Sequence, residues 1–311
     1  MPQNAKQPAF PPILVLLIGI FTASTSSIMI RFAQGEASPF VISAARLIIA
    51  TFILIPIGWK WYKLELIRLQ KNEFILLVVS GLFLALHFAT WISSLRYTRV
   101  SSSVVLVATT PLWVALFSPI FLKERISRLV ILGLLITLTG GVIVGIGNDC
   151  SLAGVSLVCP EWNEFLGGQS FLGNLLALAG AICAAGYLMV GRKVRSHLSL
   201  VTYISIVYGI SGLLLFLVSL ARGDRLTGFS MTTWLSLLGL GIFPQLIGHS
   251  AFNWSLKYLP VAFVSISLLG EPIGSTILAF LLLKEAPTTL GVVGGILIMI
   301  GISIASWSKD V

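Results

Sequence analysis

The sequence contains little charge. Only 10% of its 311 residues are Asp, Glu, Lys or Arg, whereas soluble domains carry about 25%. Apolar runs of about 20 residues, the length that a helix needs to cross a bilayer, recur along the chain. These features argue against a soluble enzyme, a DNA-binding protein and a disordered protein. The runs are continuous rather than alternating, which also argues against a porin-type barrel.

Signals for metal, nucleotide and catalytic chemistry are also scarce. The three cysteines, Cys150, Cys159 and Cys183, form no CxxC pair of the metal-binding kind, so no metal and no cofactor is predicted. The chain has no GxxxxGK[ST] loop, and ATP is therefore not indicated as an energy source. The few His and Glu residues are scattered rather than clustered as an active site requires, and we do not expect an enzyme.

The apolar runs predict an all-α integral membrane protein with ten transmembrane helices. Pro39 and Pro260 stand at predicted helix starts, where proline is favoured. The predicted helices cover residues 12–33, 39–59, 73–95, 100–122, 127–147, 170–191, 198–220, 231–256, 260–283 and 288–307.

The chain repeats itself at a constant offset of 161 residues. The matching residues include Arg31 and Arg192, Val100 and Val261, Pro111 and Pro272, and Leu122-Lys123-Glu124 and Leu283-Lys284-Glu285. We therefore predict two five-helix repeats, residues 1–147 and 170–311, joined by a loop over 148–169. Because five is odd, the second repeat would enter the membrane inverted, which is a common plan of secondary transporters.

The net charge of +9 has a topological explanation. With the N-terminus inside, thirteen Lys and Arg fall on the cytoplasmic side and six on the outer side, as the positive-inside rule requires. We therefore predict both termini in the cytoplasm, in a bacterial inner membrane, and no nucleic-acid partner.

Two copies of one motif resemble the closing two-helix signature of the EamA family, in the drug/metabolite transporter superfamily. The copies are Thr110-Pro111 through Leu122-Lys123-Glu124-Arg125 with Gly133 and Gly140-Gly141, and Gly270-Glu271-Pro272 through Lys284-Glu285 with Gly291, Gly294-Gly295 and Gly301; Ala44-Ala45-Arg46-Leu47 also fits. The resemblance covers nearly the whole chain. It implies ten helices, a central substrate cavity, and export or uptake of small metabolites.

Glu271 is the leading candidate for the substrate site. It is predicted midway along a membrane helix, where a carboxylate is costly and normally faces a cavity or a partner. Pro272 follows it and removes a backbone hydrogen bond; Pro111 does the same in the first repeat, with Thr110 in the position of Glu271. Glu271 would bind a proton or an amine, or alternatively make structural hydrogen bonds.

Five further polar or aromatic residues are predicted to border the same cavity, together with Arg46 and Thr110. His87 and Trp91 share one helix face, and Gln245, His249 and Asn253 recur at every fourth residue of another helix. Arg46 would pair with a substrate carboxylate or with Glu271, or snorkel outward. For each residue, interhelical hydrogen bonding alone is the alternative.

Cys150 and Cys159 fall in the outer loop, where a disulfide is allowed. We predict that they form one, and that Cys183 stays reduced within a helix. The glycines of the fifth and tenth helices predict small-residue seams, structural or at an oligomer contact.

The sequence thus predicts a secondary transporter of small metabolites such as amino acids, export being favoured, that works by alternating access around a central cavity. Its partners would be the substrate, membrane lipids and, if transport is coupled, protons. A flippase or membrane enzyme acting on a lipid-linked substrate is the alternative.

Overall fold

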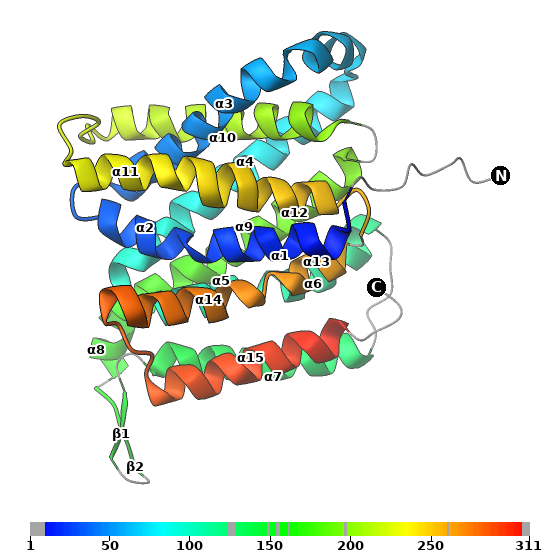
Figure 1. Cartoon of the computed structure of the whole chain (residues 1–311). Helices are drawn as coiled ribbons and strands as arrows, with labels where there is room; N and C mark the ends of the chain where they lie inside the picture. The colour runs from blue at the N-terminus through cyan, green and yellow to red at the C-terminus, as the bar shows by residue number, and fades with distance from the viewer. Residues whose placement is uncertain are drawn as a thin grey trace.

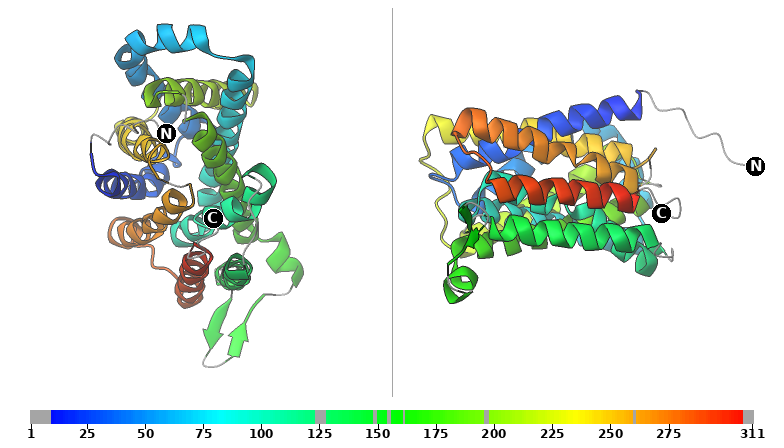
Figure 2. Two further views of the ribbon diagram at one scale, coloured as in Figure 1. Left: turned by 90° about the vertical axis from the view of Figure 1, so that its right-hand side faces the viewer. Right: turned by 90° about the horizontal axis from the view of Figure 1, so that it is seen from below.

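Helices account for nearly all of the chain in the computed structural model, which describes residues 10–122, 128–147, 150–153, 156–160, 162–195, 198–259 and 261–306. They run side by side as a bundle, with α3 and α10 at one edge and α7 and α15 at the other (Figures 1 and 2). The first part of the bundle contains α1 (Pro12–Ser24), α2 (Ser26–Ala33), α3 (Pro39–Arg68), α4 (Lys71–Tyr97), α5 (Val100–Val107), α6 (Thr110–Leu122) and α7 (Arg128–Ile146).

The second part of the bundle follows a short linker. It contains α9 (Gln169–Val194), α10 (Leu200–Ala221), α11 (Met231–Leu240), the π-helical segment η1 (Gly241–His249), α12 (Ser250–Ser255), α13 (Val261–Ser267), α14 (Gly270–Leu278), the π-helical segment η2 (Ala279–Leu283) and α15 (Thr289–Ser306).

The linker is more ordered than the predicted loop. It holds two short antiparallel strands, β1 (Ser151–Ala153) and β2 (Ser156–Val158), and a short helix, α8 (Trp162–Gly167). These short strands lie in the linker alone, and helices form the rest of the described bundle, in agreement with the predicted all-α class. A disulfide between Cys150 and Cys159 closes the hairpin at its base, with the two Cα atoms 4.3 Å apart, and holds the strands in register.

Eight helices of the described chain are long and apolar enough to cross a membrane, and this makes the protein a multi-pass membrane protein. Two shorter apolar helices, within α7 and α15, fall where the remaining two spans were predicted. The first turn of α1 and the last turn of α15 lie at the end of the bundle away from the β-hairpin (Figure 1). We call the opposite end, which carries β1 and β2, the hairpin end.

Helices α7 and α15 pack extensively against each other. A Cβ atom at Gly140 would lie 2.7 Å from the carbonyl oxygen of Gly294, and one at Gly294 would lie 2.6 Å from that of Gly140. Neither position has room for a side chain, so the two backbones meet directly. The predicted glycine seam thus contributes to a contact within the chain, between its fifth and tenth predicted helices.

Candidate functional site

Two of the predicted membrane helices are interrupted at matching prolines. Helix α5 ends at Val107 and α6 begins at Thr110, one residue before Pro111. Helix α13 ends at Ser267 and α14 begins at Gly270, two residues before Pro272. Proline lacks an N–H and clashes with the carbonyl four residues earlier, which accounts for both interruptions.

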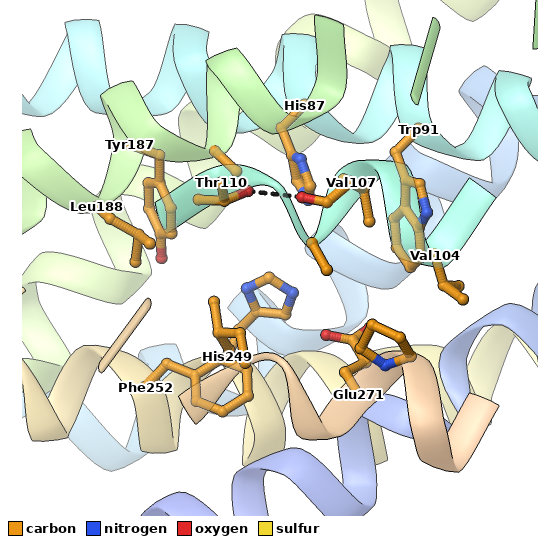
Figure 3. A pocket seen from close by; sticks show the side chains of 14 residues that line it. His87, Trp91, Val104, Val107, Thr110, Tyr187, Leu188, His249, Phe252 and Glu271 are labelled. Carbon is orange, nitrogen blue, oxygen red and sulfur yellow. Dashed lines mark hydrogen bonds between the residues drawn. The ribbon is translucent and has the colours of Figure 1, made fainter. Parts of the chain in front are cut away.

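The two interruptions satisfy their freed carbonyl groups differently. The Thr110 hydroxyl donates to the carbonyl oxygen of Val107 at 2.8 Å (Figure 3). In the second interruption, the backbone N–H of Glu271 donates to the carbonyl oxygen of Leu268 at 3.0 Å. The Glu271 side chain therefore has no part in closing its own helix break. Within the described chain its carboxylate has no hydrogen bond and no salt bridge.

A cavity of about 60 Å³ lies between the two interruptions, with room for a few water molecules. His87 of α4, Trp91 of α4 and Thr110 of α6 reach it from one side, and His249 of η1 and Glu271 of α14 from the facing side (Figure 3). The structure therefore brings five of the eight predicted substrate-binding residues to one place, with Pro272 beside them.

The two histidines present different groups to the cavity. His87 Nδ1 lies 2.9 Å from the carbonyl oxygen of Gly180. Because a carbonyl oxygen only accepts, Nδ1 carries the hydrogen, and Nε2 is the atom left for a ligand. His249 lies 6.4 Å from His87 between ring centroids. Among the described residues, neither ring nitrogen of His249 has a hydrogen-bond partner.

Trp91 contributes a free donor to the cavity wall. Its ring stacks on His87, with centroids 5.8 Å apart and planes 14° apart. The indole Nε1 is buried and has no acceptor in the described chain. A buried unpaired N–H is costly, so this group calls for an acceptor from a water molecule or a ligand in the cavity.

Arg46, Gln245 and Asn253 are buried but are not among the residues that line this cavity. The Arg46 guanidinium lies 4.1 Å from the Phe88 ring centroid, and its Nε donates to Gln245 Oε1 at 3.0 Å. Asn253 Nδ2 donates to the Tyr187 hydroxyl and to the His249 carbonyl. None of the three is among the lining residues, and their place at the substrate site stays a prediction.

The members of the predicted stripe meet different neighbours. Gln245 and His249 lie in η1 and Asn253 lies in α12. Gln245 accepts a hydrogen bond from Arg46, Asn253 donates to Tyr187, and His249 lines the cavity. Arg46 and Glu271 form no salt bridge in the described chain, so their pairing is not seen.

Sequence reasoning missed several lining residues, chiefly Tyr187 of α9 and Phe252 of α12. Phe252 follows His249 by three residues and so falls on the neighbouring face of the helix, a signal that was available. Tyr187 is a hydroxyl-bearing ring within an apolar helix, which is also a signal. The apolar lining residues, such as Val104 and Leu188, carry no such mark.

The family assignment rests on matches over both parts of the bundle. The sequence profile of the EamA-like transporter family matches residues 10–146 and again residues 171–307. The chain belongs to the EamA-like transporter family. The resemblance seen in the motif copies is thereby confirmed, and the protein is a membrane transporter of the drug/metabolite transporter superfamily.

Relatives in other organisms agree with this assignment. An uncharacterised transporter of Clostridium kluyveri is 27% identical over 303 residues, which cover 96% of this EamA protein and 93% of the relative. A WAT1-related protein of Arabidopsis thaliana is 23% identical and covers 96% and 86% of the two chains. A solved structure matches with a TM-score of 0.64 at 21% identity over 94% of this chain and 96% of the other, a likeness of fold.

Proposed function

We propose that this EamA protein is a secondary transporter that exports small polar or amphipathic metabolites, such as amino acids, by alternating access. The observation that carries the proposal is the cavity between the two interrupted helices. Among the described residues, the Glu271 carboxylate in its wall has no hydrogen bond or salt bridge and the Trp91 indole N–H has no acceptor. A ligand with both a donor and an acceptor, as in an amino acid, satisfies both groups.

The packing pattern supports two inverted five-helix repeats. Helix α4 packs on α9, and its repeat equivalent, the segment from α11 to α12, packs on α1 through η1 and α12. Helices α5 and α6 pack on α9, and their equivalents α13 and α14 pack on α1. The contacts are thus preserved when the two repeats are exchanged. Because α1 and α9 begin at opposite ends of the bundle (Figure 1), the exchange inverts the repeats.

The orientation follows from charge. Arg31, Arg96 and Arg99 belong to the minority of basic residues predicted outside. They line one pocket with Ser170, in the first turn of α9 just after the linker that carries the hairpin. We therefore place the hairpin end outside the bacterial inner membrane and both termini inside.

The test is substrate-resolved flux in proteoliposomes, with a panel of amino acids and amines, with and without an imposed proton gradient. Saturable flux of at least one compound, absent from protein-free vesicles, supports the proposal. A gradient that accelerates the flux adds proton coupling. The absence of saturable flux for the whole panel would contradict it.

One observation favours a lipid-linked substrate as the second candidate. An apolar pocket of about 340 Å³, lined by residues of α6, α7 and α9 among others, includes Thr109, the neighbour of the cavity-lining Thr110. A substrate with a hydrocarbon tail would occupy both spaces. Movement of a fluorescent lipid between leaflets of the same proteoliposomes, with no flux of water-soluble compounds, would favour this candidate.

A further inference from the structure

The segment that follows α14 has an unusual backbone. Helix α14 passes into the π-helical segment η2, which ends at Leu283. Lys284 then adopts a left-handed conformation with φ 58°, and among the described residues no other non-glycine residue has a positive φ. Backbone of this kind persists only where surrounding contacts hold it in place. The backbone N–H groups of Lys284 and Glu285 both donate to the carbonyl oxygen of Ala279, and the side chain of Glu285 makes further contacts.

Glu285 joins the second repeat to the first. Its Oε1 accepts a hydrogen bond from the backbone N–H of Val100, the first residue of α5, and its Oε2 lies 3.3 Å from Arg31 Nη2. Arg31 also donates to the carbonyl oxygen of Thr98 at 3.0 Å. The side chains of Arg31 and Glu285 are only 27% and 20% exposed, so solvent screens this pair less than a surface pair.

A second bond anchors the same segment. Arg99 Nη1 donates to the carbonyl oxygen of Ala286 at 2.9 Å. The carboxylate at the first turn of α5 also interacts favourably with the helix dipole. The start of α5 is therefore tied to the segment after η2 at the hairpin end of the bundle.

The tied helix is part of the cavity wall. Val104 of α5 lines the cavity and lies one helical turn beyond Val100, about 6 Å along the helix axis. We propose that Glu285, with Arg31 and the first turn of α5, is an ionic latch that closes the hairpin end of the substrate pathway and breaks when that end opens. The inference rests on the proposed alternating access and assigns its closing contact.

The repeat supplies a counterpart for comparison. Arg192, the equivalent of Arg31, donates to the carbonyl oxygen of Leu256, at the end of the helix before α13, as Arg31 does to Thr98 at the end of the helix before α5. The equivalent of Glu285 is Glu124, which lies outside the described residues. Arg192 thus belongs to the other end of the pathway and serves as a matched control for Arg31.

Cysteine accessibility tests the latch without requiring transport. A reporter cysteine at Val104, in a Cys183→Ala background, is labelled with a membrane-impermeant maleimide from the hairpin side of sealed vesicles. A cysteine at Gly223, in a loop at that end, reports vesicle orientation. We expect Glu285→Gln and Arg31→Gln each to raise the labelling rate about tenfold, equivalent to about 1.4 kcal/mol. Because both substitutions break the same latch, the labelling rate of the double variant should not exceed that of either single variant.

Two controls separate the latch from general loosening. Glu36→Gln weakens another contact between the repeats at this end, where Glu36 Oε2 accepts the backbone N–H of Ser230 at 2.7 Å, but Glu36 does not touch α5. Neither Glu36→Gln nor Arg192→Gln should raise labelling. The charge exchange Arg31→Glu with Glu285→Arg, which rebuilds the ion pair, should return labelling toward the parent rate.

Parent-like labelling in well-folded Glu285→Gln, or an equal rise in Glu36→Gln, would overturn the latch. If Glu285→Gln does not fold, Arg31→Gln and the charge exchange decide the question. Flux in the same vesicles keeps the two proposals apart. If labelling rises but the protein transports nothing, the proposed function is contradicted and the latch is supported. If the protein transports its substrate but labelling does not change, the proposed function is supported and the latch is contradicted.

Discussion

The two interrupted helices share a backbone plan and differ in one side chain. Both breaks precede a proline at matching positions of the repeat. In the first, the Thr110 hydroxyl serves the freed carbonyl of Val107. In the second, a backbone N–H serves Leu268, and the side chain of Glu271 faces the cavity.

The difference indicates that the two repeats share a backbone feature but contribute different side chains to the cavity. The backbone break has a structural role, because it occurs in both repeats and its freed carbonyl group is hydrogen-bonded in each. The chemistry is asymmetric, because only the second repeat places a carboxylate at the break. An inverted repeat therefore need not have a symmetric substrate site, and residues that fall on each other in sequence differ in what they contribute.

The largest effect on transport is expected when Glu271, at the second break, is replaced by threonine, the residue at the matching position of the first break. Glu271→Thr places a hydroxyl within reach of the Leu268 carbonyl, as Thr110 does for Val107, but removes the carboxylate. We expect a protein that inserts normally and unfolds near the parent temperature, yet loses transport. Flux and thermal unfolding measured on one preparation check this. Retained transport would mean that the difference between Glu271 and Thr110 is not needed for transport.

A second comparison concerns a region where the repeats are alike. Gly140→Ala and Gly294→Ala each bring a methyl group against backbone of the facing helix, and overpacking of this kind costs about 1–3 kcal/mol. We expect the two substitutions to lower thermal stability equally. Gly141→Ala and Gly295→Ala, whose nearest neighbours lie at 3.9 and 3.5 Å, are the neutral controls. Unequal losses would show that the α7–α15 contact is not symmetric.

A smaller loss is expected at the first break. Thr110→Val removes the hydroxyl that serves the Val107 carbonyl, and a lost hydrogen bond costs about 1 kcal/mol. Stability should fall by that amount, and transport should fall less than in the Glu271 variants. Thr139→Val, which removes an exposed hydroxyl bonded to its own helix at Leu135, should change neither. A Thr110→Val protein as inactive as the Glu271 variants would place substrate chemistry in both repeats.

The smallest effect is expected in the linker between the repeats. The Cys150–Cys159 bond lies in the hairpin, away from both breaks, so reduction should leave flux unchanged. Alkylation without reductant followed by intact-mass measurement should modify Cys183 alone. Three modified cysteines would contradict the disulfide.

Sequence patterns were strong where burial cost or a backbone rule fixed the answer. A proline inside an apolar run predicts a helix break. A carboxylate within the membrane, such as that of Glu271, is costly against lipid and is therefore expected to face a cavity or a partner. Thr110 was found from its position before Pro111, and His87 and Trp91 were found from their shared helix face. Family membership followed from the doubled motif.

Patterns were weak where the outcome depended on which neighbour a buried polar group meets. Arg46 was expected at the cavity. In the structure its guanidinium lies over Phe88 and donates to Gln245 and Ser26, and one sequence cannot show those pairings. The contact between Arg31 and Glu285 joins residues 254 positions apart, beyond the reach of any local spacing rule.

The most direct test of the account is flux of an identified substrate by the parent protein and Glu271→Gln, in proteoliposomes with and without a proton gradient. Glutamine keeps the size of the side chain and the backbone N–H that serves Leu268, and removes only the charge. The account predicts normal insertion and a fall in flux of at least about tenfold, equivalent to about 1.4 kcal/mol. Flux equal to that of the parent would contradict it and return Glu271 to a structural role.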